Sequence, residues 1–268
     1  MSKTIIITGA SSGIGAATAL ELAQSGANLV LGARRVDRLE QVAAQCRPLG
    51  AHVEVLCCDV RSRTDVEALV TRAVEKFGRL DVMLANAGYG LLARVHETTD
   101  EQFDDIVATN VKGTWYAMRA AADVMLRQEP QGAGRSRRGH IIAVSSANGR
   151  RSLPLFGVYS MTKAAQLSLC QAMRVELLPQ GVYVSSVHPL TTTTEFFEEV
   201  SRRSHVRSRG FGRPQSAATV ARKIAGLIRR PRPELWPVPG SAWLLTLSTA
   251  LPGLTDRSMG RTFSRSSR

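Results

Sequence analysis

The chain is poor in cysteine and has no long apolar run. Its four cysteines, Cys46, Cys57, Cys58 and Cys170, are too few for a disulfide scaffold and lack the C-x-x-C spacing of zinc ribbons and thioredoxin-type sites. No uninterrupted apolar stretch approaches the ~18 residues of a membrane-spanning helix. The N-terminal sequence MSKTIIITGA has neither the apolar core nor the A-x-A cleavage site of a signal peptide. We therefore expect a cytoplasmic protein.

Acidic residues are scarce at one end of the chain only. The formal net charge is +13, which on its face suggests an acidic partner such as nucleic acid, anionic lipid or a phosphorylated ligand. Residues 1–200 hold 21 Lys and Arg against 20 Asp and Glu, whereas residues 201–268 hold 14 against 2. The basic C-terminal quarter thus needs an explanation separate from that of the charge-balanced body.

The remaining composition is that of a globular protein. Hydrophobic residues make up 44% and charged residues 21% of the 268 residues. These values exclude disorder across the whole chain. The length fits one large domain, or two small ones of ~100–200 residues each.

Strand-like apolar runs alternate with helical patterns along the chain. The expected strands are Thr4–Thr8, Asn28–Gly32, His52–Cys57, Leu80–Ala85, His140–Ser145 and Val182–Val187, with a seventh near Leu235–Val238. The expected helices are Ala16–Gln24, Val36–Gln45, Ser62–Phe77, Thr98–Arg127, Tyr159–Leu178 and Ser216–Ile228. Because such alternation builds βαβ units, we predict an α/β fold, a single doubly wound Rossmann-type parallel sheet with helices on both faces. We assign residues 1–240 to this domain and residues 241–268 to an apolar and then basic extension, loose from Arg257 onward.

A glycine-rich turn separates the first strand from the first helix. It reads Thr8-Gly9-Ala10-Ser11-Ser12-Gly13-Ile14-Gly15, with the spacing G-x-x-x-G-x-G. Glycine permits close approach to the backbone, and a helix N-terminus favours anions. The alternative interpretation is an ordinary glycine-rich turn. We predict a pyrophosphate cradle with cofactor contacts from Gly9, Ser11, Ser12, Gly13, Ile14 and Gly15.

Two arginines, Arg34 and Arg35, follow the second strand. In NAD-preferring sites an acidic residue stands there and binds the ribose 2′-hydroxyl, whereas guanidinium groups suit the 2′-phosphate of NADP. We therefore predict that NADP(H) is preferred over NAD(H). The alternative is a pair of solvated surface arginines.

Two further segments follow strands. Asp59 and Val60 come after the third strand, and Asn86, Ala87 and Gly88 come after the fourth. Open α/β sheets bind ligands outside the carboxyl ends of their strands. We therefore predict cofactor contacts from both segments, with Asp59 near the adenine amino group.

A tyrosine and a lysine, Tyr159 and Lys163, lie four residues apart on one face of a predicted helix. A phenol has a pKa near ~10, and a neighbouring ammonium would lower that pKa and suit the phenol to acid–base work at neutral pH. Ser146 ends the fifth strand and can donate to a substrate oxygen, and Asn110 can hold a water that joins Lys163 to solvent. Alone, a Y-x-x-x-K pair is more often a surface pair; this combination is uncommon.

The combined motifs resemble the short-chain dehydrogenase/reductase family over about residues 3–195. The matching residues are TGASSGIG at 8–15, Asp59, NAG at 86–88, Asn110, Ser146 and YSMTK at 159–163. The resemblance implies that Tyr159 protonates the carbonyl oxygen during reduction and that Ser146 orients the carbonyl. It also implies that Lys163 binds the nicotinamide ribose and lowers the Tyr159 pKa, and that Asn110 supports a proton relay. The cofactor supplies the hydride.

One segment departs from the family pattern of Pro-Gly followed by Thr. Here the sequence is Pro189-Leu190-Thr191-Thr192-Thr193-Thr194, so Leu190 replaces the glycine. We expect an altered pocket beside the nicotinamide. Pro189, Thr192 and Thr194 remain candidate cofactor contacts.

Apolar residues near the predicted site suggest a hydrophobic carbonyl or alcohol substrate, although core packing or an oligomer contact would also explain them. They are Leu153, Pro154, Leu155, Phe156, Leu190, Phe196 and Phe197. We interpret Glu195, Glu198 and Glu199 as a solvated helix start. His188 is expected to be packed, and it forms no metal-ligand cluster with His140 and His205, so no metal is predicted.

We predict an oxidoreductase that transfers a hydride between NADP(H) and a small carbonyl or alcohol, assembled as a homo-oligomer (dimer or tetramer). The alternative is a noncatalytic NADPH-binding protein whose basic tail binds membrane or nucleic acid. Three explanations stay open for the tail. The favoured one is a solvated surface packed on the body or a sister subunit. The second is peripheral membrane contact through Trp236, Trp243 and Ala242–Leu254. The third, nucleic-acid binding through Arg202–Arg213, lacks interleaved aromatic residues.

Overall fold

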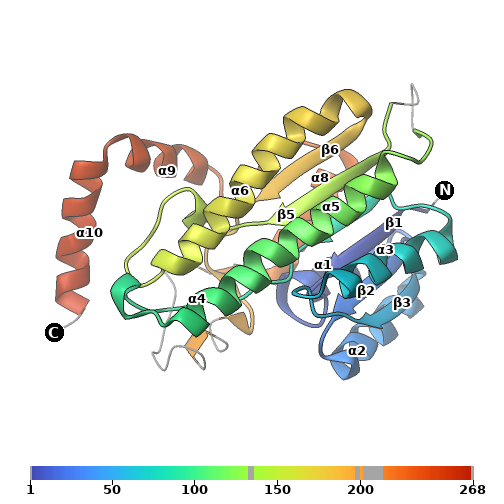
Figure 1. Cartoon of the computed structure of the whole chain (residues 1–268), viewed down its shortest axis with the longest axis horizontal. Coiled ribbons are helices and arrows are strands. Elements are labelled where there is room, and N and C mark those ends of the chain that lie inside the picture. The colour runs from blue at the N-terminus through green and yellow to red at the C-terminus, as the bar shows by residue number, and fades with distance from the viewer. Residues whose placement is uncertain (1, 132–135, 197–199, 202–213, 267–268) are drawn as a thin grey trace.

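The computed structural model, which describes residues 2–131, 136–196, 200–201 and 214–266, is built on a seven-stranded parallel sheet. The strands lie in the order β3-β2-β1-β4-β5-β6-β9 (Figure 1). Their bounds are β1 Thr4–Thr8, β2 Asn28–Ala33, β3 His52–Cys57, β4 Val82–Ala85, β5 Gly139–Val144, β6 Val182–Val187 and β9 Glu234–Leu235. The predicted doubly wound Rossmann-type fold is confirmed.

Helices cover both faces of this sheet (Figure 1). One face is covered by α1 (Gly13–Ala23), α2 (Val36–Cys46) and α8 (Ala217–Arg229). The other is covered by α3 (Arg63–Phe77), α5 (Gly113–Met125) and α6 (Gly157–Leu177). Strand β1 explains the arrangement, because Ile5 and Ile7 pack on the first face and Ile6 on the second. A continuous isoleucine run is what a strand buried on both faces requires.

The strand order reverses between β1 and β4. The chain leaving β1 therefore crosses to one side of the sheet and the chain leaving β4 to the other, which opens a crevice at the carboxyl ends of these two strands. The glycine-rich turn follows β1 and the Asn86 segment follows β4, so the topology brings both predicted segments to this crevice.

The predicted helix from Thr98 to Arg127 is interrupted. It consists of α4 (Asp100–Ile106), a π-helical turn η3 (Val107–Lys112) and α5. Thr99 and Gln102 begin α4 with a reciprocal capping box. The interruption was not expected from the sequence, and it contains Asn110.

The end of the chain differs from the prediction. The expected seventh strand starts one residue earlier and is shorter, because the prolines Pro237 and Pro239 cannot donate to a ladder. The expected loose end from Arg257 was wrong: α9 (Ser241–Ala250) is followed by α10 (Pro252–Ser266). Pro252 occupies the first turn of α10, where proline is favoured because its missing N–H is not needed.

The remaining elements are short. Strands β7 (Thr192–Thr193) and β8 (Gln215–Ser216) pair in parallel beside the main sheet. The short helical turns are η1 Arg47–Leu49, η2 Val95–Glu97, η4 Ala147–Gly149 and η5 Leu178–Gln180. Within the part of the chain that the structure describes, no helix is both long and apolar enough to cross a bilayer.

Candidate active site

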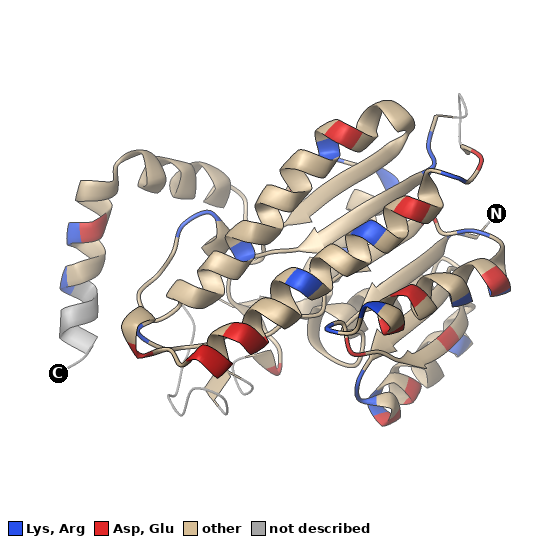
Figure 2. Cartoon of the chain, viewed as in Figure 1, with Lys and Arg blue, Asp and Glu red and all other residues tan. Residues whose placement is uncertain are grey.

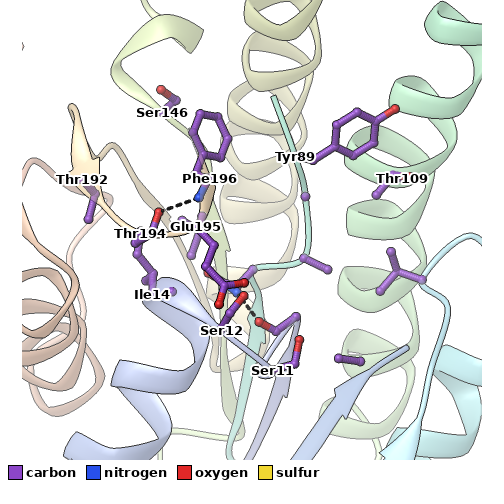
Figure 3. Close-up of a pocket in the computed structure, with 18 of the residues that line it drawn as sticks. Ser11, Ser12, Ile14, Tyr89, Thr109, Ser146, Thr192, Thr194, Glu195 and Phe196 are labelled. Atoms are coloured by element: carbon purple, nitrogen blue, oxygen red, sulfur yellow. Dashed lines mark hydrogen bonds between the residues drawn. The ribbon is translucent and has the colours of Figure 1, made fainter. Parts of the chain in front are cut away.

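A cavity of about 500 Å³ lies at the carboxyl ends of the strands (Figure 3). Segments that follow β1 to β6 form its walls. The predicted residues that line it are Gly9, Ser11, Ser12, Gly13, Ile14, Arg34, Arg35, Asp59, Val60, Asn86, Ala87, Gly88, Ser146, Tyr159, Lys163, Pro189, Thr192 and Thr194. Two predicted residues, Gly15 and Asn110, lie behind this lining. Residues far apart in the sequence thus meet in one space, as Gly9 and Phe196 do.

Glycine is required at two positions of the phosphate turn. Gly9 has φ +66°, and a Cβ there would lie 2.8 Å from the Cα of Ala87. A Cβ on Gly15 would lie 2.5 Å from the carbonyl oxygen of Gly9. Asn86 closes the turn from the side, because its Nδ2 donates to the carbonyl oxygens of Thr8 (3.0 Å) and Gly9 (3.2 Å). The sequence thus folds the turn tightly against the end of β4.

The N-terminus of α1 fits a phosphate group. Ser12, the N-cap residue, makes no side-chain bond to the first turn, and that turn contains no acidic residue. Instead, the Ser11 and Ser12 hydroxyls accept hydrogen bonds from Nη2 of Arg35, at 3.2 Å and 2.9 Å. The first-turn N–H groups and the helix dipole therefore remain suited to an anion, with a guanidinium beside them.

Glu195 brings a carboxylate to the arginines that follow β2. Its Oε2 lies 3.2 Å from Nη1 of Arg35, and its Oε1 accepts from Arg38. Partial burial raises the pKa of the Glu195 carboxyl, but the hydrogen bonds from Arg35 and Arg38 outweigh it and lower the pKa overall. The interpretation of Glu195 as a solvated helix residue missed this contact because 160 residues separate the partners.

Asp59 lines the cavity, and its carboxylate pairs with Arg61. The oxygen Oδ2 lies 2.6 Å from Nη2 of Arg61, and this hydrogen bond holds the Asp59 pKa below its ordinary value. Arg61 also binds Asp105 at 2.8 Å. An adenine amino group would share Asp59 with this arginine.

Tyr159 is buried at the end of the cavity opposite the phosphate turn. The ring packs edge-on against Phe156, at 6.0 Å between centroids, and lies 5.6 Å from Phe196. Burial raises the pKa of the Tyr159 phenol to about 12, opposed by a hydrogen bond with the hydroxyl of Ser146. The phenol is therefore held protonated near neutral pH.

Lys163 lies beside Tyr159 but points its ammonium elsewhere. Its Nζ donates to the carbonyl oxygen of Val144 (2.9 Å) and to Oε1 of Gln166 (3.0 Å), and it lies 5.7 Å from the Tyr159 ring centroid. Burial lowers the Lys163 pKa to about 7. The expected lowering of the phenol pKa by this ammonium was wrong for the structure as it stands, because burial dominates the Tyr159 pKa.

Asn110 is buried in the π-helical turn with its side chain fully engaged. Its Oδ1 accepts from the Tyr89 N–H (3.0 Å), and its Nδ2 donates to the Tyr89 carbonyl (2.9 Å) and Thr162 Oγ1 (3.0 Å). Gln166, which the sequence analysis missed, donates to the carbonyl oxygen of Asn110 at 2.7 Å. Since Gln166 also accepts from Lys163, its side chain connects the Asn110 backbone to Lys163. The water expected to join Lys163 to solvent stays a prediction.

One part of the cavity wall is apolar. Tyr89, Leu190 and Phe196 line it (Figure 3). The predicted wall residues Leu153, Leu155 and Phe156 pack behind them in the same apolar cluster, and Pro154 is exposed. Phe197, Glu198, Glu199, His205 and Arg202–Arg213 lie outside the described residues.

His188 is a packed side chain next to the site. It is buried and stacks on Trp236 with 4.3 Å between ring centroids, and burial lowers its pKa to about 4. Among the residues that the structure describes, no group of three His, Cys, Asp or Glu side chains could hold a metal ion.

Comparison with known proteins is consistent with this geometry. Residues 3–205 match the family model described as short chain dehydrogenase. The chain is 35% identical over 201 residues to the uncharacterized oxidoreductase Lmo0432 of Listeria monocytogenes, covering 74% of this chain and 78% of that protein. It is 34% identical over 234 residues to glycine betaine reductase ATRR of Emericella nidulans, covering 85% of this chain but spanning only 18% of that protein.

Solved structures are similar over nearly the whole chain. A short-chain dehydrogenase from Sphingobium yanoikuyae in complex with NADPH has a TM-score of 0.79 and 28% identity, with 95% of each chain covered. A short chain dehydrogenase/reductase from Burkholderia phymatum in complex with NAD has a TM-score of 0.81 and 26% identity, covering 94% of this chain and 95% of that chain. Since the family model matches most of the sequence, the chain belongs to the short chain dehydrogenase family of oxidoreductases.

Proposed function

We propose that this chain is an NADP(H)-dependent oxidoreductase that interconverts an apolar carbonyl compound and its alcohol. The observation that carries the proposal is one cavity with two chemically distinct ends. Tyr159, Ser146 and Lys163 line one end, and the glycine turn with Arg35 lines the other. A dinucleotide laid across it would have its phosphates at the N-terminus of α1 and its reactive ring beside the phenol.

Tyr159 is proposed as the general acid in the reducing direction. A pKa of about 12 keeps its proton in place until a substrate carbonyl arrives. The Ser146 hydroxyl, hydrogen-bonded to the phenol, would share the carbonyl oxygen with Tyr159 and orient it. Bound NADPH would supply the hydride, and the side chains would supply placement and the proton.

Lys163 is proposed to handle the proton that Tyr159 gives up. Its pKa of about 7 allows it to gain or lose a proton near neutral pH at little cost. Gln166 and Asn110 act as positioning residues, since their side chains tie Lys163 to η3 and to the Tyr89 backbone.

The preference for NADP(H) is proposed from Arg34 and Arg35. Both line the cavity where the ribose of the adenosine half would lie, and a bidentate guanidinium suits a phosphate. Glu195 pairs with Arg35, so a 2′-phosphate would share or displace that carboxylate. One similar solved protein is in complex with NADPH and another with NAD, so fold alone does not decide the preference.

We also propose that the protein forms a homo-oligomer and that its substrates are small molecules. Phe103 on α4 and Trp115 on α5, each 40% exposed, offer an apolar surface for a second copy. Sedimentation velocity would report the mass.

A screen of carbonyl compounds with NADPH and of alcohols with NADP would test the activity. We expect turnover with several apolar substrates and less with their charged analogues. Tight NADPH binding with no turnover across the whole screen would favour the noncatalytic alternative.

A further inference from the structure

The helices α9 and α10 expose apolar side chains that the folded domain leaves uncovered. Trp243 is 81%, Leu244 69% and Leu247 57% exposed on α9, Leu251 is 49% exposed between the two helices, and Leu254 is 70% exposed in the first turn of α10. Positions 243, 244 and 247 have the i, i+1, i+4 spacing that shares one helix face. We call these five residues the α9–α10 apolar surface.

The charge around this surface is one-sided. Helix α9 contains no charged residue, and α10 presents Arg257 and Arg261 in exposed positions (Figure 2). The acidic residue of α10, Asp256, forms an ion pair with Arg151 of the body. No described residue forms an ion pair with Arg257 or Arg261. Because Asp256 is paired, Arg257 and Arg261 give the described border of the apolar surface a net positive charge.

The helix pair is attached to the domain while its apolar surface stays uncovered. The Thr249 hydroxyl donates to the carbonyl oxygen of Arg150 at 3.4 Å, and the Arg151–Asp256 pair holds α10. Both arginines follow the turn η4, and α9 and α10 lie beside the sheet layers, away from α2 and β3 (Figure 1). The apolar side chains therefore face outward on an anchored element.

We propose that the α9–α10 apolar surface docks on an anionic lipid surface. Tryptophan and leucine insert shallowly at the boundary between head groups and acyl chains, and flanking arginines bind anionic head groups. Helix α9 is too short to span a bilayer, so the contact is peripheral.

A second copy of the chain fits this surface less well. Arg257 and Arg261 are exposed beside the surface, so two copies packed through it would bring like charges close together. An anionic membrane instead attracts the same charge. Charge complementarity thus selects lipid as the occupant.

Vesicle co-sedimentation of the full chain tests the proposal. We expect binding to vesicles of phosphatidylglycerol and phosphatidylcholine, little binding to pure phosphatidylcholine, and weaker binding as salt is raised. The double variant Leu244→Ser and Leu247→Ser should bind at least tenfold more weakly, and Arg257→Gln with Arg261→Gln should lose the preference for anionic vesicles.

The matched control is Val175→Ser with Leu178→Ser, which removes exposed apolar side chains at the end of α6 and beyond it (76% and 50% exposed). This variant should bind vesicles like the wild type. Absence of vesicle binding by a folded wild type would overturn the proposal. An equal loss of vesicle binding in the Leu244→Ser and Leu247→Ser variant and in the control variant would also overturn it. A fall in sedimentation mass caused by Leu244→Ser and Leu247→Ser would assign the surface to a second copy instead. None of these measurements depends on enzyme activity.

Discussion

Arg35 is a residue with two partners from distant parts of the chain. It donates to Ser11 and Ser12 of the glycine turn and pairs with Glu195 beyond β7. Replacing Arg34 and Arg35 together with alanine should weaken NADPH binding by about tenfold or more, because charge-assisted bonds to phosphate are lost. NADH binding should change far less. Fluorescence titration with both cofactors measures this, and equal losses would contradict the 2′-phosphate role.

A substitution of Glu195 tests the other side of the ion pair with Arg35. On the proposed function its carboxylate would compete with a 2′-phosphate for Arg35, whereas glutamine keeps the shape without the charge. Glu195→Gln should therefore strengthen NADPH binding by a few-fold and leave NADH binding nearly unchanged. Weaker NADPH binding would mean that the carboxylate holds the site together and does not compete within it.

Lys163 predicts a pH dependence of stability. Burial lowers its pKa from 10.5 to about 7 in the folded state, so between these values the unfolded chain binds more protons than the folded one. Stability therefore rises with pH across this window, and the cost of burying the ammonium is fully present below about pH 7. Relative to Lys163→Met, the wild type should gain about 2 kcal/mol between pH 7 and pH 9. Urea denaturation across this range measures the difference, and a flat difference would contradict it.

At the scale of elements, one side chain of the π-helical turn η3 joins that turn to the segment after β4 and to α6. Asn110 satisfies the N–H and carbonyl of Tyr89 and meets Thr162 on α6. Asn110→Ala would remove its hydrogen bonds to the buried Tyr89 N–H and carbonyl, whereas Thr162 keeps its bond to the Tyr159 carbonyl. The loss should cost about 2–3 kcal/mol in the free energy of unfolding.

Asn148→Ala is the control for this prediction, because Asn148 donates to the Ser146 hydroxyl through its backbone N–H, which the substitution keeps. It should change stability by less than about 0.5 kcal/mol. Equal effects in chemical denaturation would show that η3 does not depend on Asn110.

The elements that could be predicted are those whose own residues specify them. Thr4–Thr8, His52–Cys57 and Val182–Val187 are strands with the predicted bounds. Thr4–Thr8 and Val182–Val187 are largely buried runs rich in β-branched residues, whereas His52–Cys57 is a partly exposed edge strand whose valines favour a strand. The π-helical turn could not be predicted, since Asn110 is held by Tyr89 and Thr162 from elsewhere in the chain. The Glu195–Arg35 pair was missed for the same reason. The glycine turn, Asp59 and the Asn86 segment were foreseeable because each follows a strand, and Tyr159 and Lys163 were foreseeable because their spacing places them on one face of a helix.

At the scale of the whole molecule, the chain separates into a sheet domain and a C-terminal helix pair. Among the described side chains of residues 241–261, Ser241 is the buried one. Truncation after Gly240 should therefore lower the free energy of unfolding by less than about 1 kcal/mol, since mainly surface contacts such as Arg151–Asp256 are lost. Calorimetry of the truncated chain measures this. Failure to fold would show that α9 and α10 belong to the domain.

The sequence shows that the net charge of +13 is concentrated in residues 201–268, but it does not show what this charge binds. The body is nearly neutral, and its Arg34 and Arg35 lie at the candidate cofactor site. The part of α10 that begins at Arg257 was not predicted, because its serines and arginines show no apolar repeat that would indicate a helix. The apolar segment that precedes the basic end forms the exposed α9–α10 apolar surface.

The central claim is that Tyr159 donates the proton to the substrate oxygen, while the other cavity residues position the substrate and the cofactor. Tyr159→Phe removes one oxygen from a ring packed between Phe156 and Phe196 and should leave the fold intact. With a substrate found by the screen, single-turnover NADPH oxidation should fall by about 10²–10⁴-fold, while NADPH binding stays within about twofold of the wild type. Undiminished turnover in a variant that binds NADPH normally would contradict the account.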